Sequence, residues 1–278
     1  MLIPPSIAYI LYSTITGDSI AVLFMSGMQA GLIFGLAFVV YSFLYAKRHN
    51  IPRQEKANIK EAMIAIKESA WALGLPVLIL GGIYGGYFTP TEAAAVAAMY
   101  AIVVEMLKYK SINIHKFYEL SIKSAKTIAM LMMLIAAGSV LSWVMTVAQI
   151  PQSFAAMLTG TSKIVVLLLI NIIFLIAGML IDVNSAIIVL TPLVYPAAMA
   201  AGIDSVHLAT LIVTNLAIGM LTPPFGLNIF VATSALNVSY EKTVSGLIGF
   251  IGVSMLILLV ITYLPEVSLF FPKIFLGY

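Results

Sequence analysis

The sequence predicts an all-α polytopic membrane protein, because long uncharged apolar runs dominate the chain. Of its 278 residues, 62% are apolar and only 9% are charged, whereas charged residues make up about 25% of a typical soluble domain. The mean hydropathy is +1.10. So few charged side chains cannot cover a water-soluble fold of this size, which argues against a cytosolic enzyme, a disordered chain and a nucleic-acid partner. The solvent that suits this composition is the lipid bilayer.

Five apolar segments approach the length of about 20 residues that a membrane-spanning helix needs. They are residues 20–45, 70–87, 93–107, 127–150 and 244–264. Basic residues crowd two of the connecting segments, and the positive-inside rule places both in the cytoplasm. The first group is Lys47, Arg48, Arg53, Lys56, Lys60 and Lys67, and the second is Lys108, Lys110, Lys116, Lys123 and Lys126. Residues 59–66 are either a short helix on the membrane surface or a solvated linker.

A turn between the second and third segments carries a helix-start pattern. Thr89 is the expected N-cap, Pro90 the first helical residue and Glu92 the reciprocal partner of a capping box. The alternative role for Glu92 is ion handling.

Residues 205–236 predict one discontinuous helix with an unwound centre. The apolar stretch 205–218 reaches only about 21 Å as a helix, short of a hydrocarbon core of about 30 Å. It runs into a segment that begins at Gly219, contains Pro223 and Pro224, and ends at Gly226. Because proline lacks an N–H and clashes with the preceding turn, one regular helix cannot continue through this segment.

Residues 164–201 place polar side chains in the middle of a mostly apolar stretch. Asp182, Asn184 and Ser185 are costly in lipid unless they line a cavity or a protein interior. We interpret this segment as a re-entrant hairpin with its tip near residues 178–185, and two complete antiparallel spans are the alternative. Asp182 either caps the second helix of the hairpin or contributes to ion binding.

A short internal repeat supports the interrupted helix. Residues 1–6 resemble residues 220–225, and the match continues at the same offset through Asp18 and Asn237. The basic segments predict opposite orientations for the two copies. Inverted repeats with broken helices at corresponding positions are typical of secondary transporters that bind their substrate near the membrane midplane.

We therefore expect four functional parts. Residues 1–16 are the second half of a broken helix in the transport domain, and residues 17–126 form scaffold and arm helices with the two basic cytoplasmic loops. Residues 127–241 complete the transport domain with hairpin 164–201 and broken helix 205–236. Residues 242–278 are the last membrane helix and the C-terminal tail.

The interrupted helix also suggests a cation site. Sodium prefers oxygen ligands, and the C-terminal end of a half-helix offers carbonyls that carry partial negative charge. The predicted ligands are carbonyls near Gly219 and Phe225, the hydroxyl of Thr222, and Gly178 at the hairpin tip. The competing interpretation is that Gly219 and Gly226 only permit a kink and close helix packing.

The starts of half-helices suit an anionic substrate group, because their backbone N–H groups are free. Ser6, Ser185 and Asn228 are the expected side-chain contacts at these starts, and Asp182 completes the candidate substrate set.

Three motifs together resemble the large membrane subunit of TRAP transporters, the tripartite ATP-independent periplasmic transporters of bacteria and archaea. These are residues 2–6 (LIPPS), residues 81–93 (GGIY followed by FTPTEA) and residues 219–228 (GMLTPPFGLN). Family subunits are longer, and this chain resembles their C-terminal two-thirds.

The resemblance implies an elevator-type symporter of the bacterial inner membrane that is coupled to sodium ions. It also implies two partners: a small four-helix membrane subunit and a periplasmic substrate-binding protein. The latter delivers an organic acid, commonly a C4-dicarboxylate or sialic acid. The family's second sodium site maps onto Gly178, Gly219, Thr222 and Phe225.

The alternatives to a carrier are an intramembrane enzyme and an ion channel. An intramembrane enzyme would need a catalytic motif, and the sequence has neither a His-Glu-x-x-His zinc motif nor Gly-x-Ser-x-Gly. An ion channel could also use unwound backbone. Saturable flux that requires a sodium gradient would favour the carrier.

Overall fold

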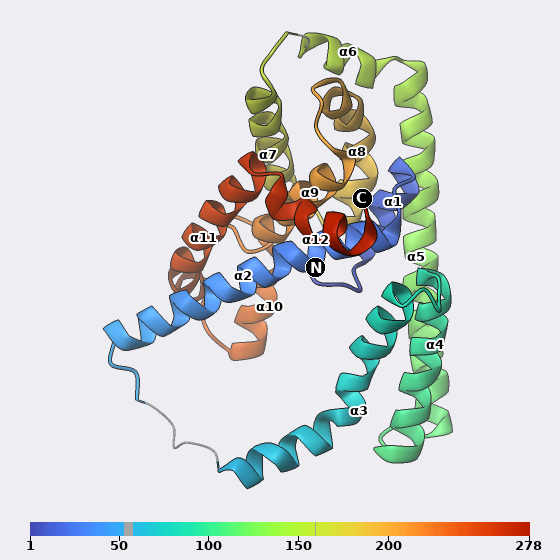
Figure 1. Ribbon diagram of the computed structural model, residues 1–278, viewed down its shortest axis with the longest axis vertical. Coiled ribbons are helices and arrows are strands. Elements are labelled where there is room, and N and C mark those ends of the chain that lie inside the picture. The colour runs from blue at the N-terminus through green and yellow to red at the C-terminus, as the bar shows by residue number, and fades with distance from the viewer. Residues whose placement is uncertain (53–57, 159) are drawn as a thin grey trace. The chain divides into compact units, whose positions relative to one another are not determined.

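The computed structural model describes residues 1–52, 58–158 and 160–278. Over these residues the regular structure is entirely helical, as the sequence predicts (Figure 1). The helices form two compact units, each described separately below. Unit 1 comprises Met1–Tyr45 and Leu134–Tyr278, and unit 2 comprises Ala46–Met133. Arg53 and Lys56 of the first basic segment lie outside the described residues. The functional division into scaffold and transport parts stays a prediction.

Within the described residues, seven helices are long and apolar enough to cross a membrane. Five of them correspond to the predicted spans. The other two lie in residues 164–201, and since each is long enough to cross a membrane, the re-entrant hairpin stays a prediction, with two complete spans as its alternative. They are α2 (Ile20–Arg48), α3 (Ile59–Tyr84), α4 with the π-helical turn η1 (Pro90–Lys108), α5 (Ile114–Val147), α7 (Lys163–Leu180), α8 (Val183–Ala200) and α11 (Tyr240–Tyr263).

Helices α3 and α5 begin well before the apolar segments that predicted them. Lys60 and Lys67 lie inside α3, and Lys116 lies inside α5. The linker interpretation of residues 59–66 is therefore wrong, since this stretch is helical. It is also not a short separate helix, because it is the first part of the 26-residue α3. It starts with a capping box in which Glu61 accepts a hydrogen bond from the backbone N–H of Asn58 at 3.0 Å.

In unit 2, the capping box at the start of α4 is confirmed. The Glu92 carboxylate accepts hydrogen bonds from the backbone N–H and the hydroxyl of Thr89, both at 2.8 Å. The Thr89 hydroxyl in turn accepts from the Glu92 N–H at 3.3 Å. Helices α3 and α4 then pack side by side, and the hydroxyl of Tyr100 donates to the carbonyl of Trp71 at 2.8 Å.

Unit 1 contains the interrupted helix that the sequence predicts. Helix α9 (Ser205–Gly219) ends where the turn begins, and α10 (Leu227–Leu236) starts beyond it. The repeat is visible in the fold, because α1 (Ile7–Thr16) and α10 both have 10 residues. Each ends in a left-handed residue, Gly17 and Asn237 respectively, and each is followed by a long span.

Helix α9 is the centre of unit 1. Most of its residues are buried, and α7, α8, α1, α11 and the short α12 (Glu266–Leu276) all pack against it (Figure 1). A short helix, α6 (Ile150–Met157), packs on α8. The unwound turn that follows α9 is less buried: residues 220–223 are half-buried and Pro224 and Phe225 are exposed. The hydroxyl of Tyr240 donates to the Pro224 carbonyl at 2.7 Å.

Candidate functional site

The C-terminal ends of α7 and α9 are in direct backbone contact. A Cβ atom added at Gly219 would lie 2.6 Å from the carbonyl carbon of Gly178 and 2.7 Å from its Cα atom. A Cβ atom at Gly178 would lie 2.9 Å from the carbonyl oxygen of Leu216. Only glycine fits at both positions. The structure thus brings together Gly178 and Gly219, which the sequence placed on opposite sides of one site.

The turn after Gly219 folds back on the end of α9. The backbone N–H of Thr222 donates to the Gly219 carbonyl at 2.9 Å, and the Thr222 hydroxyl donates to the carbonyl of Ile218 at 2.7 Å. Because this hydroxyl uses its proton inside the turn, its oxygen can serve any further group only as an acceptor. Gly226 closes the turn, since a Cβ atom there would lie 2.7 Å from the carbonyl oxygen of Met220.

Oxygen atoms dominate the chemistry of this junction. A helix C-terminus carries roughly half a negative elementary charge, and here two such ends meet at Gly178 and Gly219. In α9 the carbonyls of Leu216, Ile218 and Gly219 already accept hydrogen bonds from the turn. Across the described residues, no group of three or more His, Cys, Asp or Glu is placed to hold a metal ion. The backbone contact of Gly219 with Gly178 is the close helix packing that the competing interpretation describes, and the sodium site stays a prediction. The predicted Phe225 ligand lies in the turn, and 56% of the residue's surface is exposed.

Asp182 acts as the N-cap of α8. Its carboxylate accepts a hydrogen bond from the backbone N–H of Ser185 at 3.1 Å and a second one from the Ser185 hydroxyl. The capping interpretation is confirmed. Both side chains are satisfied by each other at the start of α8, and their contact with a substrate stays a prediction.

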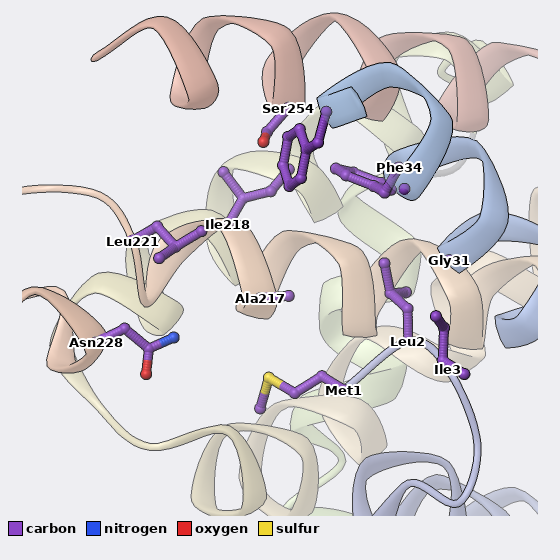
Figure 2. A pocket seen from close by; sticks show the side chains of 12 residues that line it. Met1, Leu2, Ile3, Gly31, Phe34, Ala217, Ile218, Leu221, Asn228 and Ser254 are labelled. Atoms are coloured by element: carbon purple, nitrogen blue, oxygen red, sulfur yellow. The ribbon is translucent and has the colours of Figure 1, made fainter. Parts of the chain in front are cut away.

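Asn228 lies at an apolar cavity of about 370 Å³ (Figure 2). Figure 2 shows Asn228 and Met1 on one side of the cavity, with Phe34 and Ser254 on the other. The structure therefore brings the start of the first repeat copy next to the second copy. Ser6 is the buried N-cap residue of α1 and makes no side-chain cap hydrogen bond.

A buried polar network that the sequence did not predict lies beside this junction. The Asn215 amide donates to the side-chain oxygen of Asn171 at 2.7 Å, and the Asn171 amide donates to the Thr262 hydroxyl at 2.9 Å. The available signal was an amide inside an apolar membrane segment, which is costly unless it is paired.

These features define a multi-pass helical membrane protein with a discontinuous helix, an architecture found among secondary transporters. The comparisons with known proteins are more specific. The family model of the DctM component of the tripartite ATP-independent periplasmic transporters matches residues 1–267, and the chain belongs to this family. The family that the three sequence motifs indicated is confirmed.

Three relatives illustrate the range of the family. The chain is 38% identical over 275 residues to the C4-dicarboxylate TRAP transporter large permease protein DctM of Pseudomonas aeruginosa, covering 98% of this chain and 64% of the relative. It is 38% identical over 274 residues to the isethionate TRAP transporter permease protein DctMQ of Oleidesulfovibrio alaskensis, covering 98% of this chain and 43% of the relative. It is 32% identical over 279 residues to the sialic acid TRAP transporter large permease protein SiaM of Vibrio cholerae, covering 100% of this chain and 65% of the relative.

The chain thus spans less than two-thirds of the length of these relatives. All three are named as permeases, which agrees with the prediction that the chain is not an enzyme.

Proposed function

We propose that this chain forms the sodium-binding part of the large permease subunit of a tripartite transporter that imports an organic acid across the bacterial inner membrane. The observation that carries the proposal is the meeting of two helix C-terminal ends at Gly178 and Gly219, one turn from the Thr222 hydroxyl.

The charge of this junction suits a monovalent cation. Two helix ends of roughly half a negative charge each amount to about one elementary charge. Sodium would be held by carbonyls near Gly178, Gly219 and Phe225 and by the oxygen of Thr222. Ion binding would then remove the repulsion between the two like ends, so sodium would favour the closed contact of α7 with α9.

The two repeat copies offer the places for an anionic substrate group. Helices α1 and α10 both start without a side-chain cap hydrogen bond. The first N–H groups of α1 therefore suit a carboxylate or sulfonate, whereas in α10 the N–H groups of Asn228 and Ile229 already donate to the carbonyls of Met220 and Gly226, at 3.1 and 2.8 Å. Ser6 and Asn228 stand at these starts. The start of α8 is different, because Asp182 already caps it. The Ser185 hydroxyl would donate to the substrate only if it gave up its hydrogen bond to the Asp182 carboxylate.

The substrate class is an organic acid. Isethionate, C4-dicarboxylates and sialic acid, which appear in the names of the relatives, all carry an acidic group. Their chemical diversity fits an arrangement in which a periplasmic binding protein selects the acid. A small four-helix membrane subunit completes the transporter, and the length that the DctMQ relative has beyond this chain fits such a subunit joined to the large one.

The transport step that we propose is an elevator motion. In it, α7 and α8 form a re-entrant hairpin that moves together with α1, α9 and α10. The packing of α9 on α7, α8 and α1, and of α8 on α7 and α1, supports a single moving body for these four helices, whereas α10 packs on α11.

The test is uptake of radiolabelled acids into proteoliposomes that contain the assembled transporter with its binding protein. We expect saturable uptake that requires a sodium gradient. Thr222→Val should raise the sodium concentration for half-maximal uptake, whereas Thr222→Ser should not. Thr233→Val is the matched control. The Thr233 hydroxyl also donates to a backbone carbonyl, that of Phe230 at 2.7 Å, but it lies in α10 and outside the predicted sodium ligands.

Two results would contradict the proposal. Sodium-independent flux at ion-channel rates would favour a pore. Unchanged sodium dependence in Thr222→Val would remove Thr222 from the coordination shell.

A further inference from the structure

A directional chain of hydrogen bonds crosses three apolar helices of unit 1. Asn215 of α9 donates to Asn171 of α7 at 2.7 Å, and Asn171 donates to Thr262 of α11 at 2.9 Å. The Thr262 hydroxyl in turn donates a hydrogen bond to the carbonyl of Leu258 at 2.6 Å. Exposure is 0% for Asn215 and Thr262 and 6% for Asn171. The network therefore lies in the interior and not at a solvated surface.

The network lies on the same interface as the glycine contact. Asn215 precedes Gly219 by four residues in α9, and Asn171 precedes Gly178 by seven residues in α7. Residues separated by four or seven positions share one face of a helix. The α7–α9 interface thus has an amide pair at one level and a glycine pair one to two turns further on, next to the unwound turn.

Apolar side chains alone define the axial position of two helices poorly. Leu, Ile and Val ridges offer similar packing when one helix slides along the other, whereas a buried amide pair is satisfied at one position only. A slide of one turn, about 5.4 Å, would separate Gly178 from Gly219. It would also break the hydrogen bond from Asn215 to Asn171. Asn215 would keep only the bond to the Leu211 carbonyl of its own helix, at 2.8 Å, and the side-chain oxygen of Asn171 would lose its donor in apolar surroundings, which is costly.

We propose that Asn171, Asn215 and Thr262 are positioning residues that hold α7 and α9 in the register at which the sodium ligands meet. This inference rests on the proposed sodium site at Gly178 and Gly219. The three side chains act through the helices that carry the ligands. Thr262 extends the same register to α11, the span that follows the second repeat copy.

The test replaces Asn215 by leucine, which has the same number and branching of side-chain heavy atoms and no polar atom. Thr210→Val is the matched control: Thr210 is also 0% exposed and lies in α9, but its hydroxyl pairs with Ser26 of α2 at 2.5 Å. Two quantities are measured for each variant. The first is the sodium concentration for half-maximal uptake by the assembled transporter, and the second is the rise in unfolding temperature of this chain in detergent when NaCl replaces KCl.

We expect Asn215→Leu to raise the half-maximal sodium concentration at least about threefold, which corresponds to losing one average hydrogen bond between membrane helices. The rise in unfolding temperature with NaCl should shrink accordingly. The substrate concentration for half-maximal uptake at saturating sodium should stay within twofold of wild type. Thr210→Val should leave both sodium effects unchanged. Thr262→Ser, which keeps the hydroxyl, should behave as wild type, whereas Thr262→Val should resemble Asn215→Leu.

Equal sodium effects in Asn215→Leu and wild type, or equal shifts in Asn215→Leu and Thr210→Val, would overturn the positioning role. If Asn215→Leu does not accumulate in the membrane, the Thr262→Val and Thr262→Ser pair decides the question in the same way. A wild-type transporter without any sodium effect would instead contradict the proposed function, so the two failures are distinguishable.

Discussion

The contact between Gly178 and Gly219 makes a sharp prediction for Gly219→Ala. The new Cβ atom would lie 2.6 Å from the carbonyl carbon of Gly178 and 2.8 Å from the carbonyl oxygen of Leu175, whereas ordinary contacts start at 3.4 Å. The obstacles are backbone atoms, so no side-chain rotation relieves them. The ends of α7 and α9 must separate by about 0.8 Å.

Overpacking of this kind costs about 1–3 kcal/mol, and the better helix propensity of alanine returns at most about 1 kcal/mol. We expect Gly219→Ala to lower the free energy of unfolding by about 1–2 kcal/mol. Thermal unfolding of the purified chain in detergent measures the loss. Gly246→Ala is the control, because Gly246 lies inside α11 with no atom within 4 Å of the new Cβ. It should be as stable as wild type or more stable.

The reasoning fails if Gly219→Ala unfolds at the wild-type temperature, or if Gly246→Ala loses as much stability. In either case the backbone contact would not be the cause of the cost.

Two further predictions concern the helix starts. Asp182→Asn should retain both the stability and the sodium dependence of uptake, because asparagine is also a good N-cap, whereas Asp182→Ala should lower the free energy of unfolding by about 1 kcal/mol. A large loss of sodium affinity in Asp182→Asn would instead assign the carboxylate to the ion. Thr89→Ala should destabilise the α3–α4 pair by about 1 kcal/mol, whereas Thr89→Ser should remain near wild type, because serine keeps the capping hydroxyl. Limited proteolysis measures the difference, and equal cleavage rates in the two variants would contradict a role for this cap.

The sequence predicted the membrane helices well and their ends poorly. Hydropathy identifies the part of a helix that suits lipid, whereas the helix itself continues into polar sequence. Helix α5 begins at Ile114, 13 residues before the apolar stretch at Thr127, because its Lys and Glu residues are also good helix formers. The interruption after Gly219 was predictable, because two adjacent prolines leave no regular alternative.

The candidate site was predictable in its local parts but not in its pairings. Capping by Asp182 and Thr89 depends on neighbours within three residues, so the sequence contains the whole pattern. The partnership of Asn171 with Asn215 depends on which helices lie side by side and at which register. A single sequence does not encode that information in any local pattern, and each asparagine alone is only an isolated polar residue in an apolar run.

The length of α5 has a consequence for the membrane around this protein. Its 34 residues extend about 51 Å at about 1.5 Å per residue, against a hydrocarbon slab of about 30 Å. A rod of this length has to lean or to project into the headgroups on at least one side. Thicker and thinner bilayers would therefore change its tilt, so the lipid composition of the membrane would alter the orientation of α5.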